Sequence, residues 1–160
     1  MRAVAVALLL AQAACVAATR RSTADLDARY LTGGPVGGAI HVEGAWVSGV
    51  GLEASFVDIH EHAFPAAIGA AAGGVAYAGR DGGRLWLEAE VAVKRPLPVA
   101  VGLGAGPAVE VDAVRPPRWG GEATLWVFAG VVPYVRAGWL QETGTFGELG
   151  LMIKLPVARF

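Results

Sequence analysis

The residues with the clearest capacity for chemistry lie between positions 53 and 62. His60-Glu61-His62 would place two imidazoles on one face of an extended segment, where they could share a cation. Two ligands are too few for a structural zinc site, and the chain's single cysteine cannot complete one. We therefore interpret this cluster as a polar turn and expect neither a metal site nor a cofactor.

Ser55, His60 and either Glu53 or Glu61 supply the residue types of a nucleophile, a base and an orienting acid. Nothing in their spacing requires such an arrangement, so we predict no catalytic residue. Gly102-x-Gly104-x-Gly106 lacks the following helix that a phosphate-binding loop needs, and we interpret it as a packing feature.

The N-terminal stretch has the pattern of a secretory signal peptide. Arg2 is followed by an apolar run from Ala3 to Leu10, and Val16-Ala17-Ala18 offers a small-x-small cleavage site. The run is too short for a membrane-spanning helix. Residues 1–18 are therefore expected to be removed.

Cys15 offers a second way of processing the leader. It follows Ala13-Ala14 as in a lipoprotein cleavage site, although Gln12 stands where such sites usually carry leucine. Either Cys15 is lipidated and becomes the first residue, or it leaves with the signal peptide.

The composition is unusual for a water-soluble domain. Charged residues make up 17% of the chain, against roughly 25% in globular proteins. Yet the mature part has no uninterrupted apolar stretch of about twenty residues, the length that a spanning helix needs. The net charge of −1 gives no reason to expect a nucleic-acid partner. These properties indicate either a large core or a β-barrel in lipid.

Apolar residues alternate with polar or small ones, most regularly over residues 84–94 and 99–111. A helix would scatter the two faces, so both segments are predicted strands. The same alternation, less regular, gives about eight strands in all, the others covering residues 40–46, 50–56, 66–78, 124–131, 134–139 and 148–155.

Turn residues separate these runs. Arg80-Asp81-Gly82-Gly83 has the glycines of a tight hairpin, and residues 115–121 are predicted to form a longer loop. Residues 19–35 resemble a polar leader that ends at Gly33-Gly34-Pro35, which leaves 36–160 as the folded domain. We predict an all-β, antiparallel up-and-down barrel, with a two-sheet sandwich as the alternative.

Alternation alone does not decide which face points outward. The second face of 99–111 is nearly all glycine and alanine, which suits the narrow interior of a barrel better than a solvated surface. Trp126 and Phe128 have the parity to pack over those glycines.

Charged residues share the predicted inner face and carry both signs, which suggests an internal ion-pair network. A solvated outer face is the alternative interpretation. The predicted members are Glu43, Glu53, Glu88, Glu90, Lys94, Arg136, Glu148 and Lys154.

The C-terminal segment has a polar-x-Gly-x-x-hydrophobic-x-hydrophobic pattern formed by Glu148, Gly150, Ile153 and Leu155, and the chain ends in Phe160. This pattern resembles the last strand of bacterial outer-membrane β-barrel proteins, many of which also end in phenylalanine. In that family the barrel-assembly machinery recognises this pattern. Pro156 and Arg159 interrupt the usual run to the terminal aromatic.

The resemblance implies a transmembrane barrel in the bacterial outer membrane, contacting membrane lipid and assembled by that machinery. We expect a monomer with a structural or interaction role and a lumen filled by side chains, too narrow to conduct freely. A soluble periplasmic, lipocalin-like ligand-binding barrel and a lipid-modifying membrane enzyme are the alternatives. Tyr30, Trp46, Phe56 and Trp139 are either interfacial anchors or ordinary packing residues.

Overall fold

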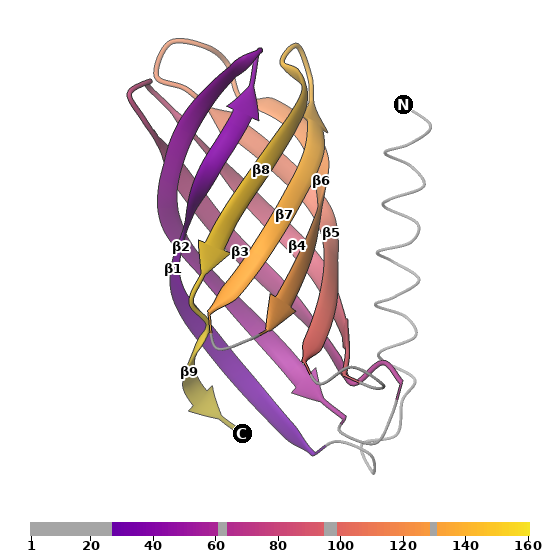
Figure 1. Cartoon of the computed structure of the whole chain (residues 1–160). Coiled ribbons are helices and arrows are strands. Elements are labelled where there is room, and N and C mark those ends of the chain that lie inside the picture. The colour runs from indigo at the N-terminus through magenta and orange to yellow at the C-terminus, as the bar shows by residue number, and fades with distance from the viewer. Residues whose placement is uncertain (1–26, 61–63, 95–98, 129–130) are drawn as a thin grey trace.

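The computed structural model describes residues 27–60, 64–94, 99–128 and 131–160, and every regular element in these ranges is a β-strand (Figure 1). The predicted signal peptide, Cys15, Glu61 and His62 lie outside the described residues. Within those ranges no helix has the length and apolar character needed to span a membrane. The strands are β1 (Ala28–Val42), β2 (Ala45–Ile59), β3 (Ala67–Ala78), β4 (Gly83–Val93), β5 (Ala100–Val111), β6 (Arg118–Phe128), β7 (Val132–Leu140), β8 (Gly144–Met152) and β9 (Leu155–Arg159).

Each strand pairs antiparallel with its neighbour in sequence from β1 to β8, and β1 also pairs with β8, which closes the sheet. Short β9 pairs with β1 beyond the end of β8, so β8 and β9 act as one interrupted strand. The predicted up-and-down barrel of eight strands is therefore confirmed. We call the end with the β1–β2, β3–β4, β5–β6 and β7–β8 connections the hairpin end, and the opposite end, where β1 begins and β9 finishes, the terminal end.

The expected boundary between leader and barrel at residue 36 is wrong, because β1 begins at Ala28. Gly33-Gly34-Pro35 does not end the strand. Val36 pairs with Met152 of β8, and Gly33 pairs with Leu155 of β9. Gly34 and Pro35 therefore lie opposite the interruption between β8 and β9. A Cβ at Gly34 would overlap the carbonyl oxygen of Ile153. The residues that resembled a break thus accommodate an irregularity in the partner strand.

Two further boundaries differ from the prediction. The expected strand 40–46 is split by a two-residue turn in which Glu43 and Gly44 have φ of 52° and 78°, as in a type I′ hairpin. Residues 115–121 are not all loop, because β6 begins at Arg118. In the turn between β5 and β6, the Asp112 carboxylate accepts a hydrogen bond from Val114 N at 2.9 Å, which lowers the pKa of that carboxyl. By contrast, the predicted hairpin glycine Gly82 does have positive φ, at 101°.

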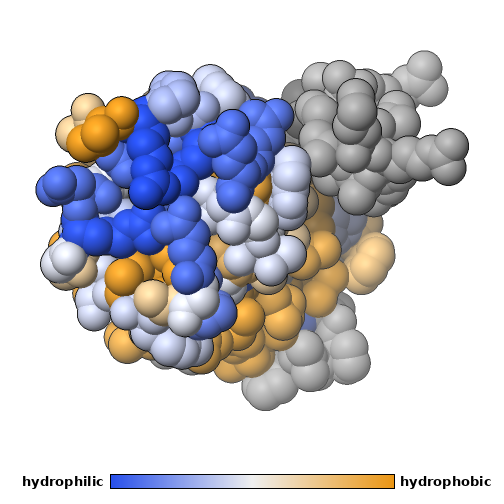
Figure 2. Space-filling model, turned by 90° about the horizontal axis from the view of Figure 1, so that it is seen from above, coloured by the Kyte–Doolittle hydropathy of each residue, from blue (hydrophilic) through white to orange (hydrophobic). Residues whose placement is uncertain are grey.

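The two faces of the wall differ sharply in polarity. Many outward-pointing residues are aliphatic and exposed, with Leu85 at 50% and Leu52 at 69%, whereas inward-pointing Arg84 and Glu88 are 1% exposed. Viewed along the barrel axis from the hairpin end, hydrophilic residues gather over that end, and hydrophobic ones lie along part of the visible flank (Figure 2). The predicted orientation of the faces, apolar out and charged in, is the one observed.

Inward aromatic rings pack over glycines of neighbouring strands. A Cβ at Gly102 would overlap the indole of Trp126, as predicted, and one at Gly73 would overlap that of Trp86. Phe146 covers Gly138 in the same way. Phe128 does not take part: it is 44% exposed and lines the terminal end. Glycine here provides room for large rings in a narrow interior.

Candidate functional site in the lumen

The middle of the lumen holds two arginines from strands that are not neighbours, bridged by glutamates. Arg84 of β4 and Arg136 of β7 both contact Glu122 of β6, with N–O distances of 3.1 Å in each pair. Both also pair with Glu148 of β8, Arg136 at 3.6 Å. These four side chains are fully buried. We call Arg84, Glu122, Arg136 and Glu148 the central cluster.

Aromatic and hydroxyl groups support the central cluster. The Arg136 guanidinium carbon lies 4.0 Å from the centre of the Trp86 ring, and that of Arg84 lies 4.2 Å from the Phe146 ring. Arg136 Nε donates to Thr124 Oγ1 at 2.8 Å. The Tyr134 hydroxyl donates to Glu148. Cation–π contacts of desolvated guanidinium groups are among the stronger ones.

A second ionic group lies at the hairpin end. Glu110 pairs with Arg80 at 3.0 Å and with Arg118 at 3.1 Å. Glu43 at the β1–β2 turn reaches Arg118 at 3.1 Å. Together these contacts cross the mouth from β1 to β6 and cover the central cluster from that side.

A third group lies on the other side of the central cluster. Lys154, in the interruption between β8 and β9, pairs with Glu90 at 3.0 Å and with Glu53 at 3.1 Å. Glu53 in turn lies 3.5 Å from Arg136, which connects this group to the central cluster. The described lumen is therefore crossed by ionic side chains at three levels.

Six of the eight predicted network residues belong to this lumen, and two do not. Glu43 is in the turn rather than on a strand face, and it joins the rim with 37% of its side chain exposed. Lys94 follows the last residue of β4 and is exposed at the terminal end, because the wall no longer encloses it there. The inward members make ion pairs with one another and are Glu53, Glu88, Glu90, Arg136, Glu148 and Lys154.

Sequence reasoning missed five members of these ionic groups. Arg84 and Glu110 have inward parity on segments that were correctly predicted as strands, so alternation alone could have identified them. Arg118 and Glu122 were missed because Pro116-Pro117 and Gly120-Gly121 resemble a loop. Arg80 extends from the β3–β4 turn over the rim, which parity does not predict.

The residues considered for catalysis do not assemble. Ser55 Oγ accepts hydrogen bonds from Lys154 Nζ at 3.0 Å and from Thr32 Oγ1 at 3.3 Å. His60 follows β2 directly, about 16 Å along the extended chain from Ser55, too far for a hydrogen bond between the two. No cluster of three or more potential metal-ligating residues occurs in the described ranges.

The C-terminal pattern has the predicted orientation. Glu148 is buried and Gly150 packs against Tyr134, whereas Ile153 and Leu155 are 41% and 57% exposed on the outer face. Phe160 is 72% exposed and lies beside Phe56, with ring centres 6.4 Å apart. The pattern is not one continuous strand, because the interruption before β9 falls inside it.

Outward aromatic residues gather near the two ends of the wall. Trp46, Trp119 and Trp139 lie within two residues of the hairpin-end limits of their strands and are 44–63% exposed. Phe56 and Phe160 lie toward the terminal end. Between them the outer surface is aliphatic, with Leu52, Leu85, Leu87, Leu103, Leu125, Val135, Leu149 and Leu151 exposed.

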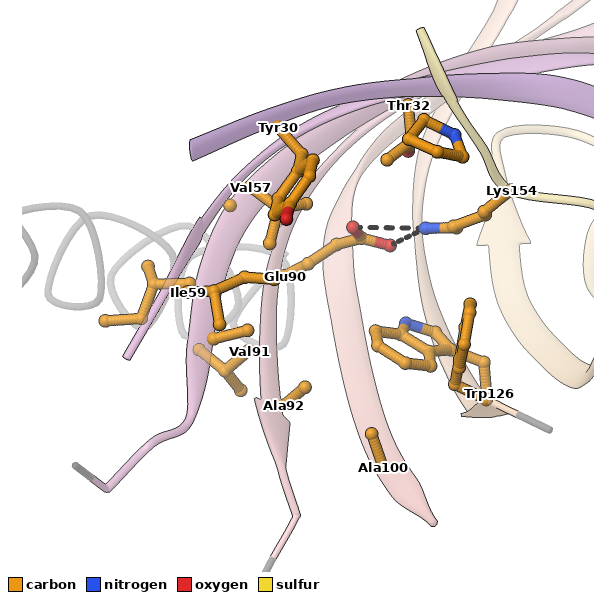
Figure 3. A pocket seen from close by; sticks show the side chains of 15 residues that line it. Tyr30, Thr32, Val57, Ile59, Glu90, Val91, Ala92, Ala100, Trp126 and Lys154 are labelled. Atoms are coloured by element: carbon orange, nitrogen blue, oxygen red, sulfur yellow. Dashed lines mark hydrogen bonds and ion pairs between the residues drawn. The ribbon is translucent and has the colours of Figure 1, made fainter. Parts of the chain in front are cut away.

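The lumen opens at the terminal end into an apolar cavity of about 300 Å³. Figure 3 shows Val57, Ile59 and Trp126 around it, with the Glu90–Lys154 pair at its inner side. A second cavity of about 360 Å³ shares Ile59, Ala67, Ala92, Ala100 and Phe128 with the first and includes Lys94 in its lining.

The fold and the lumen define a class of protein: a closed, eight-stranded up-and-down β-barrel with an ionic interior and an aliphatic outer wall. No protein family, curated protein or solved structure matches this chain.

Proposed function

We propose that this chain is an integral β-barrel of the bacterial outer membrane, with a structural or interaction role and a lumen closed by its own side chains. The observation that carries the proposal is the polarity of the wall: Leu52, Leu87 and Leu151 are more than half exposed, while Arg84, Arg136 and Glu148 are 1% exposed. Water would favour the reverse arrangement, because apolar burial is the main driving force of folding.

The exposed apolar residues are spread around the barrel rather than gathered on one side. The outward leucines occur on β2, β4, β5, β6 and β8, which are spread around the closed sheet. Soluble monomers rarely expose contiguous apolar patches larger than a few hundred Å². Acyl chains are the partner that matches an aliphatic wall facing in many directions at once.

The spacing of the outward aromatics supports the same proposal. Trp46 and Phe56 both point outward from β2. Ten residues at about 3.4 Å each, tilted by roughly 40°, span about 25 Å along the barrel axis, the height of the apolar band in outer-membrane barrels. Trp and Tyr prefer the interface between lipid and water. These rings would then mark the two edges of the band.

The lumen supports a non-enzymatic, non-conducting role. Three groups of paired charges occupy much of the interior: the central cluster, the Glu110 contacts at the hairpin end, and the contacts of Lys154. An eight-stranded barrel has little further room. We propose a monomer, because pairing of β1 with β8 closes the eight-stranded wall, and among the described strands only the short β9 is paired on one side alone. Assembly would use the barrel-assembly machinery, for which the C-terminal pattern is the candidate signal.

Fractionation of cells that produce the full chain tests the proposal. The mature protein should remain in the outer-membrane pellet after high-salt and alkaline washes, require detergent for extraction, and migrate differently on gels with and without boiling. Replacing Leu125 by arginine should reduce the folded, membrane-resistant fraction, while the same change at Val114, in the β5–β6 turn, should not. Folded protein in a detergent-free periplasmic extract would instead identify a soluble barrel.

A further inference from the structure

The terminal-end cavity is a part of the described lumen that the ionic groups do not fill. Its wall consists of side chains from β1 to β6, including Tyr30, Val57, Ile59 and Trp126, with Lys154 and Pro156 on the remaining side. A volume of about 300 Å³ lies at the lower limit of small-molecule sites. The cavity is therefore large enough for a slender ligand but not for a bulky one.

The lining determines the chemical character of such a ligand. Glu90 and Lys154 are the charged groups of the cavity, and they are already paired with each other at 3.0 Å. Lys154 also contacts Glu53 at 3.1 Å, so two carboxylates surround one ammonium. An anionic group would be repelled at this inner side, whereas hydrocarbon would meet only apolar surface. The inner part thus suits an unbranched apolar tail.

The shape of the wall agrees with a tail that enters from the terminal end. We call the cavity beside Glu90 and Lys154 the inner cavity and the second one, which includes Lys94, the outer cavity. Three small residues line both: Ala67, Ala92 and Ala100. They leave a passage between the larger Ile59 and Phe128, which also border both cavities. Each methylene buried in such a passage adds to the affinity, because it leaves water for an apolar surface.

The terminal-end opening supplies a cation for the opposite end of the ligand. Lys94 lines the outer cavity and is exposed. An anionic headgroup held at Lys94 would stay hydrated while its tail occupies the passage toward Trp126. Lysine in this position favours a ligand with a carboxylate over a ligand of the same chain length whose headgroup is neutral or cationic.

We propose that the terminal-end cavity binds one single-chain fatty carboxylate, with its hydrocarbon tail inside the barrel beside Trp126 and its carboxylate at Lys94. This site requires only the cavity and its rim, so it does not depend on where the barrel resides. It adds a ligand-binding activity to the structural role proposed above.

A photoreactive dodecanoate, with a diazirine at the tail end, tests the proposal on the full-length mature protein in phosphatidylcholine nanodiscs. Cross-linked residues are located by mass spectrometry. We expect inward residues such as Val57, Ile59 and Trp126 to be labelled, and unlabelled dodecanoate to compete better than dodecanol or dodecylamine. Labelling confined to outward residues such as Leu87 and Leu125 would show only partition into lipid and would overturn the proposal.

Two variants sharpen the test. Ala100→Phe narrows the passage and should reduce inward labelling several-fold, while Ala76→Phe on the outer face of β3 is the matched control. Lys94→Glu should reverse the preference between dodecanoate and dodecylamine, whereas Arg115→Glu at the hairpin end should not. Inward labelling insensitive to both Ala100→Phe and Lys94→Glu also refutes the site. Heat-modifiable migration of each variant checks that it is folded, independently of ligand.

Discussion

The Tyr134 ring lies across Gly150, so that a Cβ at Gly150 would approach the tyrosine hydroxyl oxygen to 2.5 Å and the Gly37 carbonyl oxygen to 2.6 Å. This contact lets the Tyr134 hydroxyl reach the buried carboxylate of Glu148. The glycine of the C-terminal pattern therefore has a packing role inside the barrel, separate from any role in recognition during assembly. The two roles can be distinguished by experiment.

Gly150→Ala should destabilise the barrel by about 1–3 kcal/mol, as expected for overpacking of a filled interior. The measurement is urea unfolding of the purified chain in lipid vesicles, where no assembly machinery is present. Gly147→Ala on the same strand is the control, because a Cβ there meets nothing within 4 Å. Equal stabilities of the two variants would leave Gly150 with a recognition role alone.

Arg84→Met should cost about 3–5 kcal/mol, because it leaves the buried carboxylates of Glu122 and Glu148 without one of their cations. Adding Glu148→Gln to this variant should recover part of the loss, since the second change removes an uncompensated charge. Arg115→Met should cost less than about 1 kcal/mol, because that side chain is 59% exposed. Strictly additive losses in the double variant would mean that Arg84 and Glu148 are not energetically coupled.

Leu125→Arg should reduce the free energy of folding into bilayers by about 2–4 kcal/mol if this position lies near the middle of the apolar band. The same substitution at Val114, 86% exposed in the β5–β6 turn, should have almost no effect. Denaturant titrations in vesicles measure both. A soluble barrel predicts the opposite sign for Leu125, because arginine on a hydrated surface removes an exposed apolar side chain.

The purified barrel should show no stable conductance steps in planar lipid bilayers, because Arg84, Arg136 and Lys154 with their glutamates cross the lumen. Persistent open levels at low voltage would show that these contacts do not close it. The double variant Arg84→Ala with Arg136→Ala removes the largest side chains of the central cluster and should increase ion leakage relative to Arg115→Ala.

The sequence alone determined the strands, and which residues share a face, where alternation is regular. In β4 and β5 almost every second residue is aliphatic. Because successive Cβ atoms point to opposite sides of a strand, this pattern separates Leu87 from Glu88 without knowledge of any partner. The count of eight strands followed from the same periodicity.

Tertiary structure alone decided which charges meet and where the barrel begins. Glu122 joins Arg84 and Arg136 across the lumen, a contact set by closure of β1 on β8 and not by sequence distance. Gly33-Gly34-Pro35 has the composition of a break, yet it belongs to β1 because its partner strand is interrupted there. Local propensity describes a residue's own backbone, whereas pairing and closure depend on strands that lie far away along the chain.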